Sequence, residues 1–244
     1  MKKTIYALLI AFSFLCLKVD KRTNIWMVGD STMAWKNPKS EPESGWGEGL
    51  KEFVKNKAMV HNHAANGRSS KSFVNEGRWK AVLDSIRPGD YVVIQFGHND
   101  EKNDSTLHTD PYTSFKQYLK KYIDETRQKG GIPLVCNSIV RRHFDAAGNL
   151  KNSHGEYINA AREAAMENKT LFVDMEALTR KLVVEMGPQK SKTLFVFCQP
   201  GECPKRPKGS ADSTHLNYEG ARRVAGLFIS DIKKRRLLMR KFFK

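Results

Sequence analysis

The sequence has little cysteine, no internal repeat and no linker-like tract. Only four cysteines occur among 244 residues and no C-x-x-C pair exists, which removes the usual support for a structural zinc site. Nothing rich in Gly and Ser separates two patterned halves, so we expect a single domain over residues 21–244 that ends in a basic C-terminal helix. The content of 40% hydrophobic and 28% charged residues is that of an ordinary globular domain.

A long hydrophobic run of membrane-spanning length is also lacking. The apolar stretch that opens the chain, MKKTIYALLIAFSFLCLKV, is too short to cross a bilayer comfortably, and Lys2 and Lys3 precede it. This layout is typical of a secretory signal peptide, which we expect to cover residues 1–20, although no A-x-A pattern marks the cleavage point. We therefore expect an exported protein, periplasmic or secreted, with no stable membrane insertion after the signal is removed.

Acidic residues are scarce beside basic ones. The chain has 26 Asp and Glu against 42 Lys and Arg, a formal net charge of +16, which favours anionic partners. The last twelve residues, KKRRLLMRKFFK, hold seven of the positive charges beside Leu, Met and Phe and predict a basic amphipathic end to the final helix. Because an exported protein meets acidic polysaccharide or envelope lipid more often than nucleic acid, we expect an acidic glycan as the leading partner and no nucleic acid.

Export also permits disulfides. Cys198 and Cys203 flank the turn pair Pro200-Gly201, which can bring them together, so a local bridge is one expectation. Cys136 lies inside the apolar run IPLVCNSI and reads as a buried free thiol. Nothing in the sequence indicates the oligomeric state.

Short runs rich in apolar and β-branched residues alternate with segments of helical spacing. The runs cover residues 24–28, 59–64, 91–96, 132–139 and 170–173. The helical segments cover residues 78–86, 112–128, 154–167, 175–186 and 218–236. This alternation predicts right-handed βαβ units and a parallel sheet covered on both faces. Ligands bind beyond the carboxyl ends of the strands in such folds, so the chemistry is expected in the segments that follow the strands.

Four segments together hold the parts of a serine-nucleophile site. Three of them, GDST, NHAANGRSSKSF and GHND, follow strands, and the fourth, ADSTHLNYEG, precedes the last helix. A serine hydroxyl needs a base and a carboxylate that orients the base. Ser31 can be the nucleophile, His215 the base and Asp212 the carboxylate, the last two lying three residues apart on one loop. Read singly, each segment is also compatible with an ordinary turn or helix cap.

Such a site also needs hydrogen-bond donors for the oxyanion. Gly67 can supply an unobstructed backbone N–H, and Asn99 can supply its side-chain amide. Ser31 can supply its own N–H at the N-terminus of a helix, where the dipole favours negative charge. We expect Asp30 to tie down the nucleophile turn by hydrogen bonds.

The four blocks GDS, Gly67 in its loop, GxND and DxxH occur in the order that the SGNH, or GDSL-type, hydrolase superfamily has. The longer stretches NHAANGRSSKSF, VVIQFGHND, PLVCNSIVRRHFDAAGNL and DSTHLNYEGA resemble its rhamnogalacturonan acetylesterase branch, over roughly residues 24–226. The resemblance implies a flavodoxin-like three-layer α/β/α sandwich with a central parallel five-stranded sheet. It also implies removal of acetyl groups from pectic rhamnogalacturonan without a cofactor.

Carried over residue by residue, the resemblance implies that Ser31 is the nucleophile and that Asp212 and His215 are the acid and the base. It assigns the oxyanion hole to Ser31, Gly67 and Asn99. The segment from Cys198 to Cys203 and the basic tail have no counterpart in the resemblance.

Other residues near the expected catalytic edge are candidates for substrate binding. Arg68, Arg141 and Arg142 can pair with galacturonate carboxylates, the alternative being ordinary surface arginines. We expect His98, between Gly97 and Asn99, to be a hydrogen-bonded loop residue and not a second base, although it lies close enough to affect substrate binding. The tryptophans at positions 35, 46 and 79 can stack on sugar rings or pack in the core.

Two local patterns suggest other readings. His61 and His63 share one face of a strand, as metal ligands or nuclease residues can, but the sequence supplies no matching distant ligands, so we expect no metal. Asp174 ends the strand LFVD and rivals Asp212 as the acid of the triad. Asp212 is favoured because its loop also holds His215.

Two alternatives remain for the whole protein. One is a related esterase that acts on another acylated substrate, such as acetylated xylan, a lipid or a thioester, because the superfamily blocks specify acyl transfer and not the substrate. The other is a non-catalytic glycan-binding protein, against which the intact set of Ser31, Asp212 and His215 argues.

Overall fold

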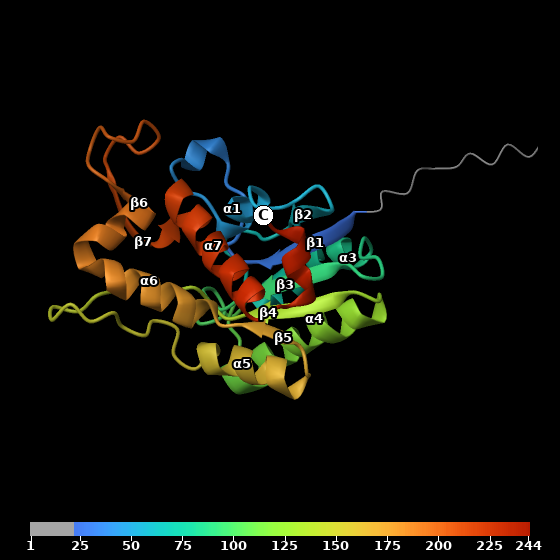
Figure 1. Ribbon diagram of the computed structural model, residues 1–244. Helices are drawn as coiled ribbons and strands as arrows, with labels where there is room; N and C mark the ends of the chain where they lie inside the picture. Colours follow the sequence, from blue (N-terminus) through green and yellow to red (C-terminus); the bar gives the residue numbers. More distant parts are fainter. Residues whose placement is uncertain (1–21) are drawn as a thin grey trace, which may run out of the picture.

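The computed structural model describes residues 22–244 and is built around a parallel sheet of five strands (Figure 1). The order is β2-β1-β3-β4-β5, and every neighbouring pair is parallel. The strands are β1 Thr23–Gly29, β2 Ala58–Asn62, β3 Tyr91–Gln95, β4 Ile132–Cys136 and β5 Leu171–Val173. The predicted flavodoxin-like sheet is confirmed, while the expected signal peptide lies outside the described residues.

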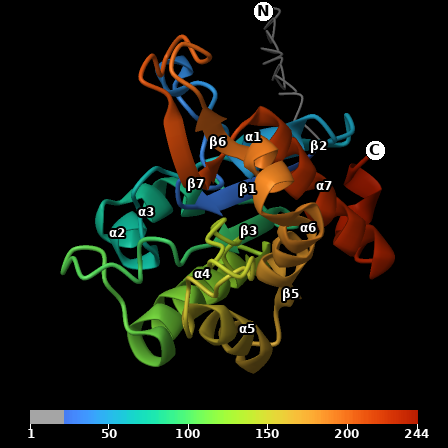
Figure 2. The same cartoon turned by 90° about the vertical axis from the view of Figure 1, so that its left-hand side faces the viewer.

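Helices cover both faces of the sheet and make three layers (Figure 2). One face carries α1 Trp46–Lys51, α6 Met175–Lys190 and α7 Tyr218–Lys234. The other carries α2 Ser70–Asn75, α3 Arg78–Leu83, α4 Lys116–Gln128 and α5 Tyr157–Glu167. Shorter helical turns are Pro38–Ser40, Pro111–Phe115, Ser191–Leu194 and Leu238–Phe242. None of the helices within residues 22–244 has the length and apolarity that crossing a membrane requires.

The two cores follow from the alternation of side chains along the strands. Ile25 and Met27 of β1 pack into the core beneath α7, whereas Trp26 and Val28 pack into the core beneath α4. Successive side chains of a strand point to opposite faces, so a strand buried on both faces is apolar at every position. This is why the strands read as continuous apolar runs in the sequence.

A two-stranded antiparallel hairpin stands apart from the main sheet (Figure 1). It consists of β6 Phe195–Cys198 and β7 Ser210–Leu216. Val196 pairs with Asp212 but Phe195 pairs with Leu216, so residues 213–215 form a bulge. The expectation that Asp212 lies on a loop is therefore wrong. A bulge interrupts the period of two, which is why no strand is evident in that stretch of sequence.

The basic tail folds back onto the core instead of extending the last helix. Helix α7 ends at Lys234, and Arg236 has a left-handed backbone with φ 56°. Phe243 is buried, and the N–H of Lys244 donates to the carbonyl of Phe53 at 2.8 Å. The expectation of a helix through residue 236 is corrected accordingly. The aromatic side chains anchor the tail, while its charged side chains are exposed.

Asp90 fastens the amino ends of β1 and β3. Its buried carboxylate accepts hydrogen bonds from the backbone N–H of Asn24 at 2.9 Å, from the Trp26 indole at 3.1 Å and from the N–H of Arg87 at 3.0 Å. This end of the sheet lies opposite the carboxyl ends of the strands.

We expect Asp90→Ala to lower the free energy of unfolding by about 3 kcal/mol, because it leaves several buried donors without an acceptor. Urea unfolding followed by circular dichroism measures this. The matched control is Asp84→Ala, which removes an exposed carboxylate paired with Lys80 and should leave the unfolding midpoint unchanged. Equal midpoints for the two variants would contradict the fastening role of Asp90.

Candidate active site

The bulge in β7 turns Asp212 and His215 toward each other. The two side chains meet at 2.7 Å between His215 Nδ1 and Asp212 Oδ2. The other carboxylate oxygen accepts the backbone N–H of Thr214 at 2.8 Å and of His215 at 2.9 Å. Burial by itself would raise the pKa of Asp212, but the hydrogen bonds from the His215 ring and from the two N–H groups hold it well below its usual value. The carboxylate is therefore ionised and favours the tautomer with the proton on Nδ1.

Ser31 completes a chain of contacts with this pair. It lies in the turn after β1, and its Oγ is 3.0 Å from Nε2 of His215. As expected, Asp30 ties down the turn, because its Oδ1 accepts the N–H of Thr32 at 2.9 Å and the hydroxyl of Thr32 at 2.8 Å. A serine hydroxyl, an imidazole and a carboxylate are thus joined in the order that activates a serine.

No helix begins at Ser31, which corrects the expectation of a helix dipole at its N–H. Residues 31–34 form a single turn closed by a bond from the Ala34 N–H to the Asp30 carbonyl, and α1 begins only at Trp46. Pro38 disfavours helical backbone at the residue before it, so the turn cannot extend through residue 37. Any contribution of the Ser31 N–H comes from its place in the turn.

The three expected oxyanion donors keep hydrogens available. The N–H groups of Ser31 and Gly67 have no hydrogen-bond acceptor within residues 22–244. Gly67 has φ +74°, while a Cβ there would meet nothing within 4 Å, so its backbone conformation and not crowding favours glycine. Asn99 donates one amide hydrogen to the carbonyl of Arg68 at 3.1 Å, which leaves its second hydrogen for a ligand.

A buried ion pair that the sequence analysis missed joins these segments. Lys36 Nζ contacts Glu43 Oε1 at 2.5 Å and Asn66 Oδ1 at 2.8 Å, and its side chain is 4% exposed. Glu43 also binds Arg206 at 3.2 Å, and its Oε1 lies 3.9 Å from His215 Nε2. Lys36 therefore ties the segment after the Ser31 turn to the loop that carries Gly67. Neither Lys36 nor Glu43 belongs to a sequence motif, because only the fold of the chain brings the two side chains together.

Comparison with known proteins shows to which family the chain belongs. Residues 27–223 match the GDSL-like lipase/acylhydrolase family. The chain belongs to this family. The rhamnogalacturonan acetylesterase RhgT of Bacillus subtilis is 39% identical over 216 residues, which are 88% of this chain and 92% of the relative. The protein is accordingly a carboxylic ester hydrolase.

Solved structures agree with the fold of this GDSL-family hydrolase. The crystal structure of protein YxiM from Bacillus subtilis superimposes with a TM-score of 0.74 at 25% identity, covering 89% of this chain but only 58% of that chain. The acetylxylan esterase Axe2 of Geobacillus stearothermophilus superimposes with a TM-score of 0.60 at 16% identity, covering 88% of this chain and 96% of the other. The second likeness concerns the fold alone.

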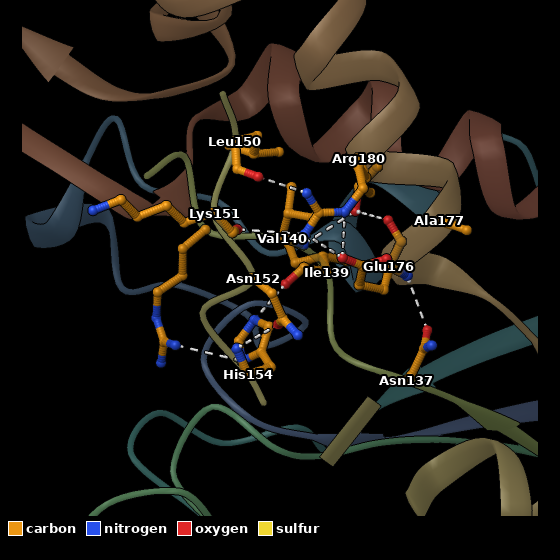
Figure 3. A network of polar contacts seen from close by, with 12 residues as sticks. Asn137, Ile139, Val140, Leu150, Lys151, Asn152, His154, Glu176, Ala177 and Arg180 are labelled. Carbon is orange, nitrogen blue, oxygen red and sulfur yellow. Dashed lines mark hydrogen bonds and ion pairs between the residues drawn. The ribbon is translucent and has the colours of Figure 1, made fainter. Parts of the chain in front are cut away.

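His98 is enclosed next to the candidate site of the hydrolase. The residue is 3% exposed, and neither ring nitrogen has a hydrogen-bond partner in the described part of the chain, so the expectation of a hydrogen-bonded side chain is wrong. Burial, with the neighbouring charges of His154 and Arg141, holds the pKa of His98 well below its usual value, so the ring is neutral. His154 lies edge-on to it with ring centroids 4.4 Å apart. The ring of His154 is held in turn by the Ile139 carbonyl, 2.9 Å from its Nε2 (Figure 3).

The three arginines considered for substrate binding all have partners within the protein. Arg141 pairs with Glu101 and donates to the His98 carbonyl at 3.2 Å. Arg142 lies over the ring of Phe197 at 4.8 Å and donates to a serine hydroxyl at 3.1 Å. Arg68 has a side chain that is 34% exposed, and it pairs with the carboxylate of Glu76, which follows α2. Their contact with substrate stays a prediction.

Asp174, the alternative candidate for the acid of the triad, has a structural role. Asp174 caps α6 by accepting the N–H of Ala177 at 3.0 Å, and Asn137 donates to it at 2.8 Å. Asn137 also accepts the N–H of Glu176, which secures the same helix end (Figure 3). Asp174 is thus occupied in helix capping, whereas Asp212 is in direct contact with His215.

The remaining candidates are placed as follows. His61 stacks on Trp26 with ring centroids 4.3 Å apart, and no group of three or more His, Cys, Asp or Glu residues among residues 22–244 is arranged to hold a metal ion. Trp46 and Trp79 are in the core, whereas Trp35 is 56% exposed.

Cys136 is a buried free thiol, as predicted. Cys198 and Cys203 are also free thiols, and their side chains are in contact. The structure therefore lacks the disulfide that is expected between them. A hydrogen bond to Cys198, with some burial, raises the pKa of Cys203 to about 11. The Cys203 thiol is therefore protonated at neutral pH.

We expect Lys36→Met to lower the free energy of unfolding by about 3 kcal/mol, because Glu43 would remain buried without its ammonium partner. The double variant Lys36→Met/Glu43→Gln should recover part of the lost stability, because residue 43 then carries no charge. Chemical denaturation of wild type, both single variants and the double variant measures the coupling. Strictly additive effects would contradict the pairing.

Proposed function

We propose that the protein is a serine acetylesterase that removes acetyl groups from an acidic pectic polysaccharide of the rhamnogalacturonan type. The contact chain from Ser31 through His215 to Asp212 is the observation that carries the proposal. The name of the relative RhgT, which matches nearly the whole chain, supports the substrate class. The net charge of +16 is suited to an anionic polymer.

The first half-reaction transfers the acetyl group to the enzyme. His215 Nε2 takes the proton of Ser31 while Oγ attacks the acetyl carbonyl carbon. The tetrahedral oxyanion is stabilised by the free hydrogens of Ser31, Gly67 and Asn99. His215 then gives its proton to the sugar oxygen as the ester bond breaks, which leaves acetyl-Ser31 and a free sugar hydroxyl.

The second half-reaction returns the enzyme to its starting state. His215 removes a proton from water, whose oxygen attacks the acetyl carbonyl of acetyl-Ser31. Collapse of the second tetrahedral intermediate returns the proton to Ser31 Oγ and releases acetate. Throughout, ionised Asp212 stabilises the imidazolium that forms in each half-reaction. The protein's own residues suffice for every step, so the proposal includes no cofactor.

Related activities remain as alternatives. An esterase for acetylated xylan, a lipid or a thioester would use the same mechanism, because the family specifies the chemistry and not the acyl acceptor. A non-catalytic glycan-binding role is disfavoured, since it would not require the contact between Ser31 and His215. The pectic substrate is preferred on the similarity to RhgT and on the basic charge.

Acetate release from acetylated rhamnogalacturonan tests the proposal, with acetylated xylan and acetylated homogalacturonan as comparisons. We expect Ser31→Ala to be nearly inactive, and Asn99→Ala to lose a factor of roughly 100 to 1,000 in rate through loss of one oxyanion donor. Equal release of acetate by wild type and by Ser31→Ala would contradict the serine-nucleophile mechanism. A preference for xylan would retain the mechanism and overturn the pectic assignment.

We further propose that the protein is exported, to the periplasm or the medium. The support is the sequence of residues 1–20, with two lysines before an apolar stretch. Expression of the full chain should yield a processed product outside the cytoplasm whose N-terminus falls between residues 18 and 24. Recovery of the intact chain from the cytoplasm alone would show the proposal to be wrong.

A further inference from the structure

A cavity of about 550 Å³ opens beside the proposed catalytic histidine and has no role in the mechanism above. Its walls come from the segment after the Ser31 turn, from residues 41–44, from α1 and from the first residue of α7. Four glutamates line it together with Lys36, Trp35 and Tyr218. Its location, its aromatic rings and its charges each bear on what it can bind.

Its location places it on the leaving-group side of the reaction. Glu43 lines the cavity, and its Oε1 lies 3.9 Å from His215 Nε2, the nitrogen that contacts Ser31. In ester cleavage this nitrogen delivers the proton to the departing oxygen, which belongs to the sugar and not to the acetyl group. The polysaccharide chain therefore emerges next to Glu43, toward the cavity.

Its aromatic rings are exposed. Trp35 is 56% exposed and Tyr218 is 61% exposed, although large aromatic side chains usually bury most of their area. Tyr218 is fixed by a hydrogen bond from its hydroxyl to Glu52 at 2.6 Å. An exposed aromatic face in a hollow is suited to the apolar face of a sugar ring.

Its charges favour an uncharged ring. Lys36 is the only cation among the lining residues, and it is already engaged by Glu43 and Asn66 with its side chain 4% exposed. No cation of the lining is thus free to pair with a uronate carboxylate. The lining carboxylates of Glu41 and Glu48 can instead accept hydrogen bonds from sugar hydroxyl groups.

We infer that this cavity is a glycan subsite that binds an uncharged sugar ring, stacked on Trp35 and linked to the acetylated residue. The inference rests on the proposed function and specifies it further. In a polymer that alternates a uronate with a neutral sugar, the neighbour of an acetylated uronate is neutral. The subsite thus distinguishes such a polymer from homogalacturonan, in which each neighbour carries a carboxylate.

The test compares kcat/KM on an acetylated rhamnogalacturonan oligosaccharide with kcat/KM on 4-nitrophenyl acetate, which has no sugar. For Trp35→Ala the ratio of the two values should fall about tenfold, mainly through a higher KM for the oligosaccharide, and Trp35→Phe should restore most of it. The matched control Tyr112→Ala changes another exposed aromatic residue, 45% exposed and not part of the cavity lining, and should leave the ratio as in wild type. An unchanged ratio for Trp35→Ala overturns the inference.

A binding measurement separates this inference from the proposed function. Titration calorimetry with the Ser31→Ala variant reports oligosaccharide binding without turnover. Adding Trp35→Ala to that variant should weaken binding about tenfold. Equal affinity of the two variants, or no binding by either, overturns the subsite. Failure of wild type to release acetate from the oligosaccharide overturns the proposed substrate instead, whatever the calorimetry shows.

Discussion

The hydrogen bonds that converge on the Asp212 carboxylate hold the candidate site in its working arrangement. One oxygen accepts two backbone N–H groups of the bulge and so stabilises the bulge itself. The other oxygen holds the ring of His215, whose far nitrogen meets Ser31. A regular strand would place residues three apart on opposite faces, so both the bulge and the carboxylate are needed to join them.

The charges next to His215 are opposite in sign to the net charge of the whole chain. The protein carries a net charge of +16, yet Glu43 and Asp212 both lie within 4 Å of the His215 ring. Carboxylates at that distance attract the positive charge that the proposed acyl transfer places on the ring. Lys36 and Arg206 limit this effect, because each pairs with Glu43. The net charge of the whole chain therefore does not describe the surroundings of His215, where two carboxylates lie within 4 Å of the ring.

Much of the fold could be predicted from the sequence, because each strand of a sheet buried on both faces is an apolar run. The blocks around Ser31, Gly67 and Asn99 could be placed by their position at strand ends, and the block with His215 by its position before the last helix. The hairpin could not, since the bulge before Leu216 breaks the alternation that marks a strand. Side-chain partners such as those of Arg141 and Lys36 were missed for another reason. They depend on which distant segments the fold brings together, and no spacing encodes that.

The hairpin has a mechanical consequence. The proposed nucleophile sits on the five-stranded sheet, whereas its base sits on a separate two-stranded one, and the two are joined near the site by bonds such as that from the Ser44 N–H to the Leu216 carbonyl at 2.8 Å. The distance between Ser31 Oγ and His215 Nε2 therefore depends on the position of the hairpin relative to the five-stranded sheet. If the hairpin swung away, the hydroxyl would lose its base and Phe195 and Leu216 would leave the core beneath α7, while the five-stranded sheet kept its own hydrogen bonds.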